Sequence, residues 1–301
     1  MSDAFDSKPL APDFEFVLNG NELDFQTGLS ALSRIAPTFL GISSKQTMAA
    51  LTEAKNVDVY VFKGAHPAGN VGVQINHIKP VNKGEIVWTV DPEVVIFIGR
   101  LFNSGKVNMT RVIALGGSRM NEPAYCKAVI GADLATLLNG RIADAASSRI
   151  INGNVLTGVK SSMDGWLQSP YRHITAIPEV SKADEFMGWA SLNPNRFSIY
   201  RTFTTWLAGK RNKECSMDAR LKGGERAIVC LDEYDRMLPM DIYAEFLLKA
   251  IIAFDIDKME QLGIYEVAPE DFALAEYADT SKIELQRIVR EGLDRMRAEM
   301  S

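Results

Sequence analysis

The longest uninterrupted runs of apolar residues in this chain are five residues long, at 94–98 and 250–254. A helix that crosses a bilayer needs about 20 consecutive, mostly apolar residues. The 301 residues are nevertheless 47% hydrophobic, which excludes a disordered chain. Apolar residues that are plentiful but confined to short runs are typical of amphipathic helices and strands around buried cores. We therefore expect two or three folded domains and no membrane-spanning segment.

The charge balance argues against a protein that coats nucleic acid. Lysine and arginine number 33 and aspartate and glutamate 38, so the net charge is −5. Phosphate backbones require a concentrated basic surface. The densest basic group is Lys210, Arg211 and Lys213, which Asn212 interrupts and Glu214 follows. We interpret this group as a solvated loop and expect no nucleic-acid partner.

Cysteine and histidine spacings give no metal or disulfide pattern. The cysteines are odd in number, widely spaced and without a CxxC pair, at Cys126, Cys215 and Cys230. The histidines stand outside any HxxxH or HExxH frame, at His66, His77 and His173. We therefore expect no bound metal and a reducing compartment. The first residues also lack the basic and apolar regions of a signal peptide.

The first hundred residues alternate between helix and strand patterns. Apolar spacing predicts helices over 24–35 and 47–55, and alternation predicts a strand over 57–61. A further helix is predicted from Asp91, Pro92 and Glu93, which suit the cap, the first position and the first turn. It should run to about Asn103 and stop at Gly105. This order favours a layered α/β domain.

From residue 111 onward the predicted secondary structure changes. The predicted strands are short and separated by turns, at 111–115, 128–130, 149–152 and 154–156. They indicate a small mixed β domain that ends near Ile177. The later part is predicted to be helical, over 241–254, from 268–271 onward, and behind a capping box at 281–284. We interpret 234–236, just before the first of these helices, as a solvated turn.

A glycine-containing loop at 63–72 is the most suggestive local feature. Glycines let a backbone approach a ligand closely, and a helix start behind the loop could present N–H groups to an anion. The loop has only Gly69 and Gly72 at the right spacing, without the GxGxxG or GxxxxGK[ST] signatures. A tight crossover loop with a structural proline explains it more simply.

His66, followed by Pro67, could act as a general base or as a polar contact for a quinone or flavin carbonyl. No partner acid or nucleophile stands beside it, so a loop histidine satisfied by the protein is the simpler reading. No Ser-His-Asp, Cys-His or paired-glutamate arrangement is evident, and we assign no catalytic residue.

Many short runs, spread over about residues 5–298, point to one family. In order they are 64–69 (GAHPAG), 76–78 (NHI), 87–90 (VWTV), 111–118 (RVIALGGS), Asn121 and Pro123, 149–158 (RIINGNVLTG), 188–189 (GW), 197–199 (FSI), 224–227 (GERA) and 233–241 (EYDRMLPMD). Through these runs the chain resembles the NqrA family, the A subunits of the sodium-translocating NADH:quinone oxidoreductase of bacterial membranes.

The resemblance implies an α/β, multi-domain architecture. Residues 1–110 would form a Rossmann-like domain, 111–182 a soluble-ligand-binding β-grasp (SLBB) domain, and 183–301 a C-terminal domain, mixed and then mainly helical. Members of the family begin with a further lipoyl-like region and the first Rossmann strand. On this comparison the chain is expected to be a fragment that lacks roughly the first third, with an incomplete Rossmann-like domain.

The resemblance also implies a function. The chain would be a peripheral subunit on the cytoplasmic side of the inner membrane, where it shapes or gates the ubiquinone site with the membrane-embedded B subunit. NADH, flavins and the iron–sulfur cluster would belong to other subunits, with no cofactor bound here. His66, Pro67, Gly69 and Gly72 are the candidates for contact with quinone or a partner. Two alternatives stay open, namely a soluble flavin- or dinucleotide-dependent oxidoreductase and an assembly module without a ligand.

Overall fold

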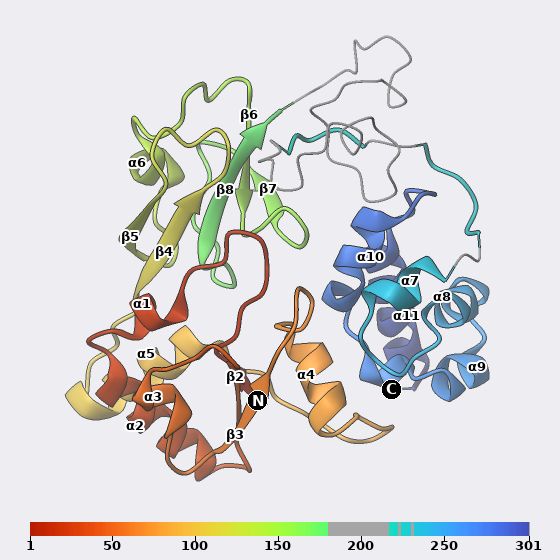
Figure 1. Ribbon diagram of the computed structural model, residues 1–301, viewed down its shortest axis with the longest axis horizontal. Coiled ribbons are helices and arrows are strands. Elements are labelled where there is room, and N and C mark those ends of the chain that lie inside the picture. The colour runs from red at the N-terminus through yellow and green to blue at the C-terminus, as the bar shows by residue number, and fades with distance from the viewer. Residues whose placement is uncertain (180–216, 222–223, 230–231, 301) are drawn as a thin grey trace.

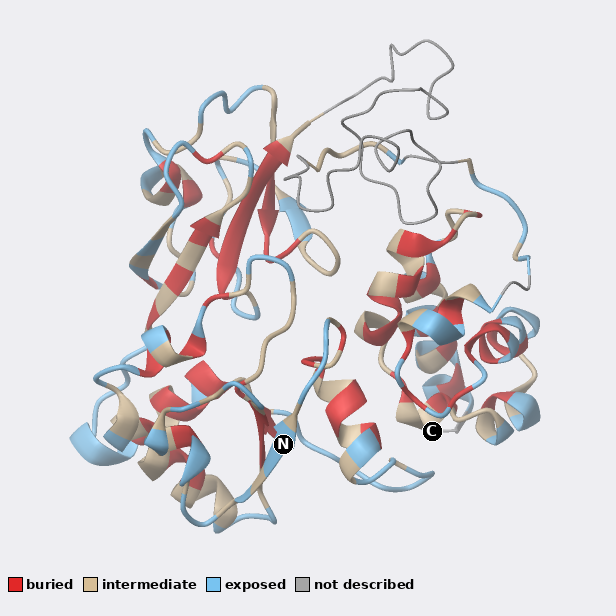
Figure 2. Cartoon of the chain, viewed as in Figure 1, coloured by how far each residue is buried: buried red, intermediate tan, exposed pale blue. Residues whose placement is uncertain are grey.

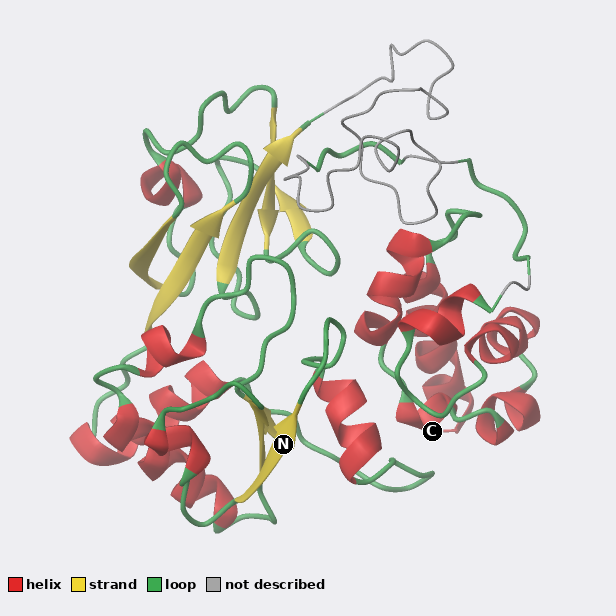
Figure 3. Cartoon of the chain, in the orientation of Figure 1, coloured by secondary structure: helices red, strands yellow, loops and turns green. Residues whose placement is uncertain are grey.

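The computed structural model describes residues 1–179, 217–221, 224–229 and 232–300 (Figure 1). It contains two β-sheets in the first 180 residues, followed by a region of helices and loops (Figure 3). The mixture of helices and sheets expected from the sequence is confirmed. The boundary at 182, the runs at 188–189 and 197–199, and the basic group at 210–213 lie outside the described residues.

The first sheet is parallel and has three strands. Its order is β1 (Ser2–Asp3), β2 (Phe39–Ser43) and β3 (Asp58–Phe62). On the far side of β1, Val90 adds a single parallel bridge to Ser2. The three strands point the same way, so the loops that follow β1 and β3 leave the same edge of the sheet. A Rossmann-like assignment for this sheet remains a prediction.

Two helices, α2 (Glu22–Ser33) and α5 (Pro92–Ser104), cover one face of this sheet. They lie very close together, because a Cβ on Gly99 would stand 1.7 Å from the backbone oxygen of Asp24. Their shared core, with the sheet, includes side chains that are fully buried: Phe25, Leu29, Leu40, Leu51 and Val95. Two shorter helices, α1 (Phe14–Leu18) and α3 (Ala49–Thr52), complete this layer.

The local predictions for these elements are largely confirmed. Helix α2 begins two residues before the predicted start at 24, and α3 is shorter than predicted. Asp91 caps α5 as expected, since its side chain accepts from the Glu93 amide at 2.8 Å. Gly105 ends that helix in the left-handed conformation, with φ of 70°.

Helix α4 (Val71–Ile78) lies on the opposite face of the first sheet. Gly41 of β2 makes this approach possible, because a Cβ there would stand 1.9 Å from Gln74 Oε1. On its other side, Val73 of α4 belongs to the core of the C-terminal helices. One helix therefore packs against both the first sheet and the C-terminal region.

The second sheet has five strands in the order β5-β4-β8-β6-β7. The strands are β4 (Thr110–Gly116), β5 (Ala124–Val129), β6 (Ser148–Asn152), β7 (Val159–Ser161) and β8 (His173–Pro178). Strand β8 pairs in parallel with β4 and antiparallel with β6, and it is buried along almost its whole length (Figure 2). Helix α6 (Leu134–Leu138) packs on this sheet.

The predicted strand at 154–156 is wrong. Asn154 instead forms a turn, in which its Oδ1 accepts from the amides of Leu156 and Thr157 at 2.7 and 2.9 Å. The strand at 128–130 is displaced, because β5 occupies 124–129. Strand β8 carries no alternating pattern and was not among the predicted strands.

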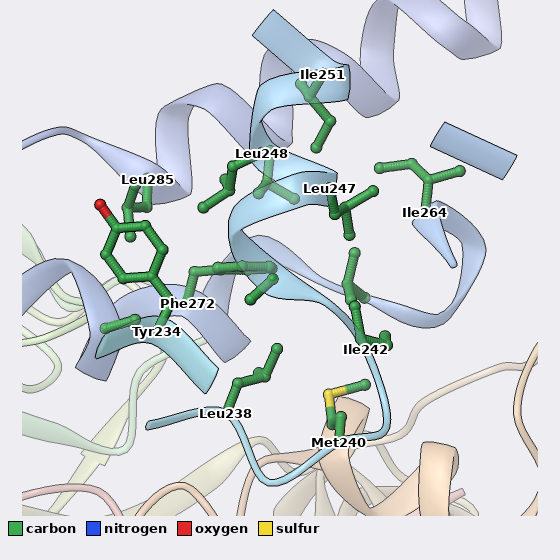
Figure 4. Packing of buried hydrophobic residues seen from close by; sticks show 14 of the residues in the cluster. Tyr234, Leu238, Met240, Ile242, Leu247, Leu248, Ile251, Ile264, Phe272 and Leu285 are labelled. Carbon is green, nitrogen blue, oxygen red and sulfur yellow. The ribbon is translucent and has the colours of Figure 1, made fainter. Parts of the chain in front are cut away.

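The C-terminal region consists of five α-helices in its described part, joined by loops and short 3-10 turns. They are α7 (Glu233–Met237), α8 (Ala244–Ala253), α9 (Ile256–Gln261), α10 (Ala273–Ala278) and α11 (Leu285–Met300). Leu247, Leu248, Phe272 and Leu285 meet at its centre (Figure 4). No helix among the described residues is both long and apolar enough to cross a membrane.

The capping box predicted at 281–284 is wrong. Helix α11 begins at Leu285, and the Ser281 hydroxyl donates to the Ala227 carbonyl at 2.9 Å instead. That serine therefore ties a distant segment to the helical region and does not cap the helix. The start predicted at 268–271 is confirmed in modified form, since a 3-10 turn at Pro269–Phe272 precedes α10.

Candidate functional site

A cavity of about 320 Å³ opens beside the glycine loop, within the size range of small-molecule sites. Four parts of the chain form its walls: the loop after β3, one side of α4, the segment around α7, and Leu274 of α10. The lining residues are Phe62, Lys63, Gly64, Ala65, His66, Pro67, Ala68, Val73, His77, Arg236, Met237, Pro239 and Leu274. We refer to this cavity as the loop pocket.

The loop is held by the segment that follows β1. The Gly69 amide donates to Ser7 Oγ at 2.9 Å. A Cβ on Gly69 would stand 2.3 Å from the Phe5 carbonyl oxygen, so only glycine fits this approach. The loops that leave β1 and β3 at the same sheet edge are therefore fastened to each other, and this contact fixes one wall of the pocket.

His66 shares the same serine. Its Nδ1 lies 3.1 Å from Ser7 Oγ, whereas its Nε2 is buried without a hydrogen-bond partner. Burial is the main cause of a lowered pKa for this imidazole, with Lys8 adding to the effect. Burial therefore favours the neutral imidazole. The peptide bond between His66 and Pro67 is cis.

The opposite wall is tied to α4 through His77. Its Nε2 lies 2.9 Å from the Pro239 carbonyl oxygen. A carbonyl oxygen only accepts, so this nitrogen carries the proton and donates. Nearby, Asn76 donates to Glu266 Oε2 at 2.6 Å. The bond to Pro239 holds the segment after α7 against α4 and fixes the second wall of the pocket, and the bond to Glu266 fastens α4 to the 3-10 turn at Ile264–Glu266.

Gly72 lies outside the loop pocket and faces a buried carboxyl group. A Cβ on Gly72 would stand 2.4 Å from Asp271 Oδ2, which accepts from the Ala268 amide at 2.9 Å. Burial raises the pKa of Asp271 to about 7. The start of α4 is therefore covered by the protein's own side chain, where the sequence suggested an anion site.

The structure thus separates the four candidate residues. His66 and Pro67 line the loop pocket, whereas Gly69 and Gly72 pack against other parts of the protein. Contact of any of the four with a quinone or a partner stays a prediction.

The crevice where a dinucleotide would be expected is filled by an ion-pair network. Ligands of parallel α/β sheets bind where the strand order reverses, here between β1 and Val90. Arg172, directly before β8, reaches this point and pairs with Asp6 at 2.7 Å and with Asp91 at 3.4 Å. The amide at the N-terminus of α5 is already capped by Asp91. These carboxylates disfavour a phosphate at this helix start.

Most residues of the loop pocket were not among the site candidates, and those outside the glycine loop include His77, Arg236 and Leu274. Arg236 belongs to the segment interpreted as a solvated turn, which is in fact helix α7. The one signal in the sequence for Arg236 was that it lies within the family-like run at 233–241. No local pattern indicates that this run meets the loop at 64–69, more than 160 residues earlier.

Comparisons with known proteins agree with the sequence motifs. A family model described as the NqrA second alpha/beta domain matches residues 2–107, and one described as the NQRA C-terminal domain, of the SLBB type, matches residues 112–162. The A subunit of the Na(+)-translocating NADH-quinone reductase from Neisseria meningitidis serogroup C is 34% identical over 297 residues. The A subunits of the same reductase from Pasteurella multocida and Haemophilus influenzae are 32% and 34% identical. In each comparison 98% of this chain aligns with 66% of the relative's length.

Proposed function

The chain belongs to the NqrA family, and we propose that it serves as one component of a Na(+)-translocating NADH-quinone reductase. The similarity supports this proposal because it runs through 98% of the chain, across both sheets and the C-terminal helices. In this role the chain takes part in quinone reduction coupled to sodium export. It sits peripherally on the cytoplasmic side of the membrane, against the membrane-embedded B subunit.

The chain's contribution is to shape or gate the quinone site. The single observation that carries this assignment is the loop pocket, which brings together the loop at 62–68 and the segment at 236–239. Its walls are largely apolar, and its edges carry cationic and imidazole side chains. A quinone needs an apolar slot for its ring and polar groups for its carbonyl oxygens, so this lining suits it.

The proposal assigns no cofactor to this chain and leaves NADH, the flavins and the iron–sulfur cluster to other subunits. The ion pairs of Arg172 with Asp6 and Asp91 support this assignment, because they occupy the crevice where a nucleotide phosphate would bind. Quinone is then the one redox-active molecule expected to approach the chain.

The first test is to tag the protein in its host and purify it from detergent-solubilised membranes. We expect sodium-stimulated NADH:quinone reductase activity to co-purify with it. Recovery as a lone protein would contradict the proposal, and bound yellow flavin on that lone protein would favour the soluble oxidoreductase.

The second test blocks the loop pocket. Ala65 is exposed at the pocket, so Ala65→Trp should fill the mouth without disturbing a core. We expect the purified complex to keep its subunits and its NADH oxidation but to lose most of its quinone reduction. Unchanged quinone reduction would show that the pocket is not part of the quinone site.

A further inference from the structure

The loop pocket has an electrostatic character opposite to that of the whole chain. The chain carries a net charge of −5, yet none of the residues that line the pocket is an aspartate or a glutamate. Two of the lining residues, Lys63 and Arg236, carry a positive charge. A cavity lined by one sign of charge raises the local concentration of ligands of the other sign.

Both cations are available for a ligand. Lys63 comes directly after β3 and Arg236 lies on α7, and both side chains are exposed at the pocket. Among the described residues neither has an ion-pair partner. Arg172 and Arg111, by contrast, are buried in ion pairs with carboxylates. An unpaired arginine retains its planar set of N–H donors for an anionic oxygen.

The remaining walls of the pocket are apolar and suit a ring-shaped ligand. Phe62, Val73, Met237 and Leu274 contribute apolar surface, and Pro67 adds a rigid apolar edge. A small hydrated ion such as inorganic phosphate would leave this surface uncovered, whereas a flat apolar ring would cover it. The pocket therefore combines an apolar slot with a cationic rim.

We propose that the loop pocket preferentially binds a quinonoid ring that carries an ionised oxygen, with Arg236 as the principal contact for the negative charge and Lys63 as the second. This inference rests on the proposed function and deepens it. The pocket would bind an anionic ring more tightly than a neutral ring of the same shape, because attraction between opposite charges adds to the burial of the ring.

The test uses two probes of nearly equal shape. One is 2-hydroxy-1,4-naphthoquinone, which is an anion at neutral pH, and the other is its neutral methyl ether. Binding of each to the purified 301-residue chain is measured by calorimetry. We expect the anion to bind about tenfold more tightly, a difference of about 1.4 kcal/mol. The preference should fall as salt is added.

Two substitutions test whether Arg236 is the source of the preference for the anionic probe. Arg236→Gln should reduce it to less than about threefold, whereas Arg236→Lys should retain most of it because the charge remains. The control is Arg290→Gln, which removes the same charge from an exposed position on α11, outside the pocket lining. It should leave both affinities unchanged. Ala65→Trp should weaken both probes together.

The outcomes separate this inference from the proposed function. If both probes bind equally and Ala65→Trp weakens both, the pocket takes quinones but the charge preference is refuted. If the preference survives Arg236→Gln, the assignment to that side chain is refuted. If neither probe binds, or if inorganic phosphate competes with the anion as strongly as the neutral ether competes with it, the pocket is not a quinone site. That outcome refutes both the charge preference and the quinone role proposed for the pocket, whereas co-purification of the reductase activity decides the role in the complex separately.

Discussion

Arg111 illustrates how one residue can connect two parts of the chain. It begins the run at 111–118, and its side chain is 1% exposed. Its Nε donates to Glu93 Oε2 at 2.7 Å, and one Nη donates to the Ser169 carbonyl at 2.6 Å. The sequence placed Glu93 in the first turn of α5 only as a partner of the helix dipole. The structure adds that it neutralises a buried guanidinium on β4.

We predict that Arg111→Met lowers the free energy of unfolding by about 3–5 kcal/mol, because it leaves the Glu93 carboxylate buried and unpaired. The control is Arg287→Met on the exposed face of α11, which breaks surface ion pairs with Glu284 and Glu291. That change should cost less than about 1 kcal/mol. Urea unfolding measures both, and equal losses would contradict the importance assigned to the buried pair.

Asp271 gives a prediction about pH. Its pKa is about 7 in the folded protein and near 3.8 when the chain is unfolded. Because the pKa is higher in the folded state, proton binding by this carboxyl adds to the free energy of unfolding. That contribution is fully present below pH 3.8 and is lost as the pH rises toward 7. We expect Asp271→Asn, which cannot ionise, to gain stability relative to the unsubstituted protein over this interval. Urea midpoints measured at a series of pH values test this.

A matched control has the opposite sign. Hydrogen bonds from the backbone and side chain of Thr136 lower the pKa of Asp133, so its ionised form stabilises the fold. Asp133→Asn should therefore lose stability relative to the unsubstituted protein as pH rises through the range below 3.8. A difference that does not depend on pH for Asp271→Asn would mean that this carboxyl titrates normally.

At the scale of elements, those with local signals were predictable. Helix α5 followed from its cap, its proline and its terminal glycine, which act within one turn. Strand β8 was missed because it lies between β4 and β6 with both faces buried, so its sequence does not alternate. The strand predicted at 154–156 was wrong because the Asn154 side chain accepts from the amides of Leu156 and Thr157, and apolar content does not reveal this competing turn.

Helix α4 supplies the prediction at this scale. Gly72→Ala would press a Cβ against Asp271, forcing α4 away from the C-terminal helices. We expect a loss of about 1–3 kcal/mol in the free energy of unfolding. Gly224→Ala is the control, because nothing lies within 4 Å of a Cβ there. It should change stability by less than about 0.5 kcal/mol. If thermal unfolding shows similar changes for both, the close contact at Gly72 is not energetically important.

At the scale of the whole molecule, Arg172 links the two sheets. It precedes β8 of the second sheet and pairs with Asp6 and Asp91 at the edge of the first. All three groups are at least partly buried, so their pairing is protected from solvent. Nothing in the sequence around Arg172 indicated this role, because both partners lie more than 80 residues away.

We predict that Arg172→Gln loosens the contact between the sheets. Backbone amides of residues 3–8 and of β8 should exchange hydrogen faster, whereas those of α8 and α11, in the C-terminal core, should not change. Hydrogen exchange with mass spectrometry measures all of them in one experiment. Faster exchange spread evenly over the chain would indicate general destabilisation and would contradict a local link.

The candidate site was only half predictable, because its two walls come from distant parts of the sequence. The loop at 63–72 stood out through its glycines and His66, which are neighbours in sequence. The cations of the loop pocket come from residues 63 and 236, and only tertiary packing brings them together. Periodicity and turn signals describe local structure, so they identified one wall of the pocket and not the other.

Because α4 packs against both the first sheet and the C-terminal helices, the loop pocket depends on both parts of the chain. A graft of residues 1–110 onto another protein would carry His66 and Lys63 but neither Arg236 nor the partners of His77 and Asn76. A substitution that displaced the segment at 236–239 would alter the wall of the pocket that faces the loop after β3. Residues from both ends of the chain therefore set the shape and the charge of the pocket.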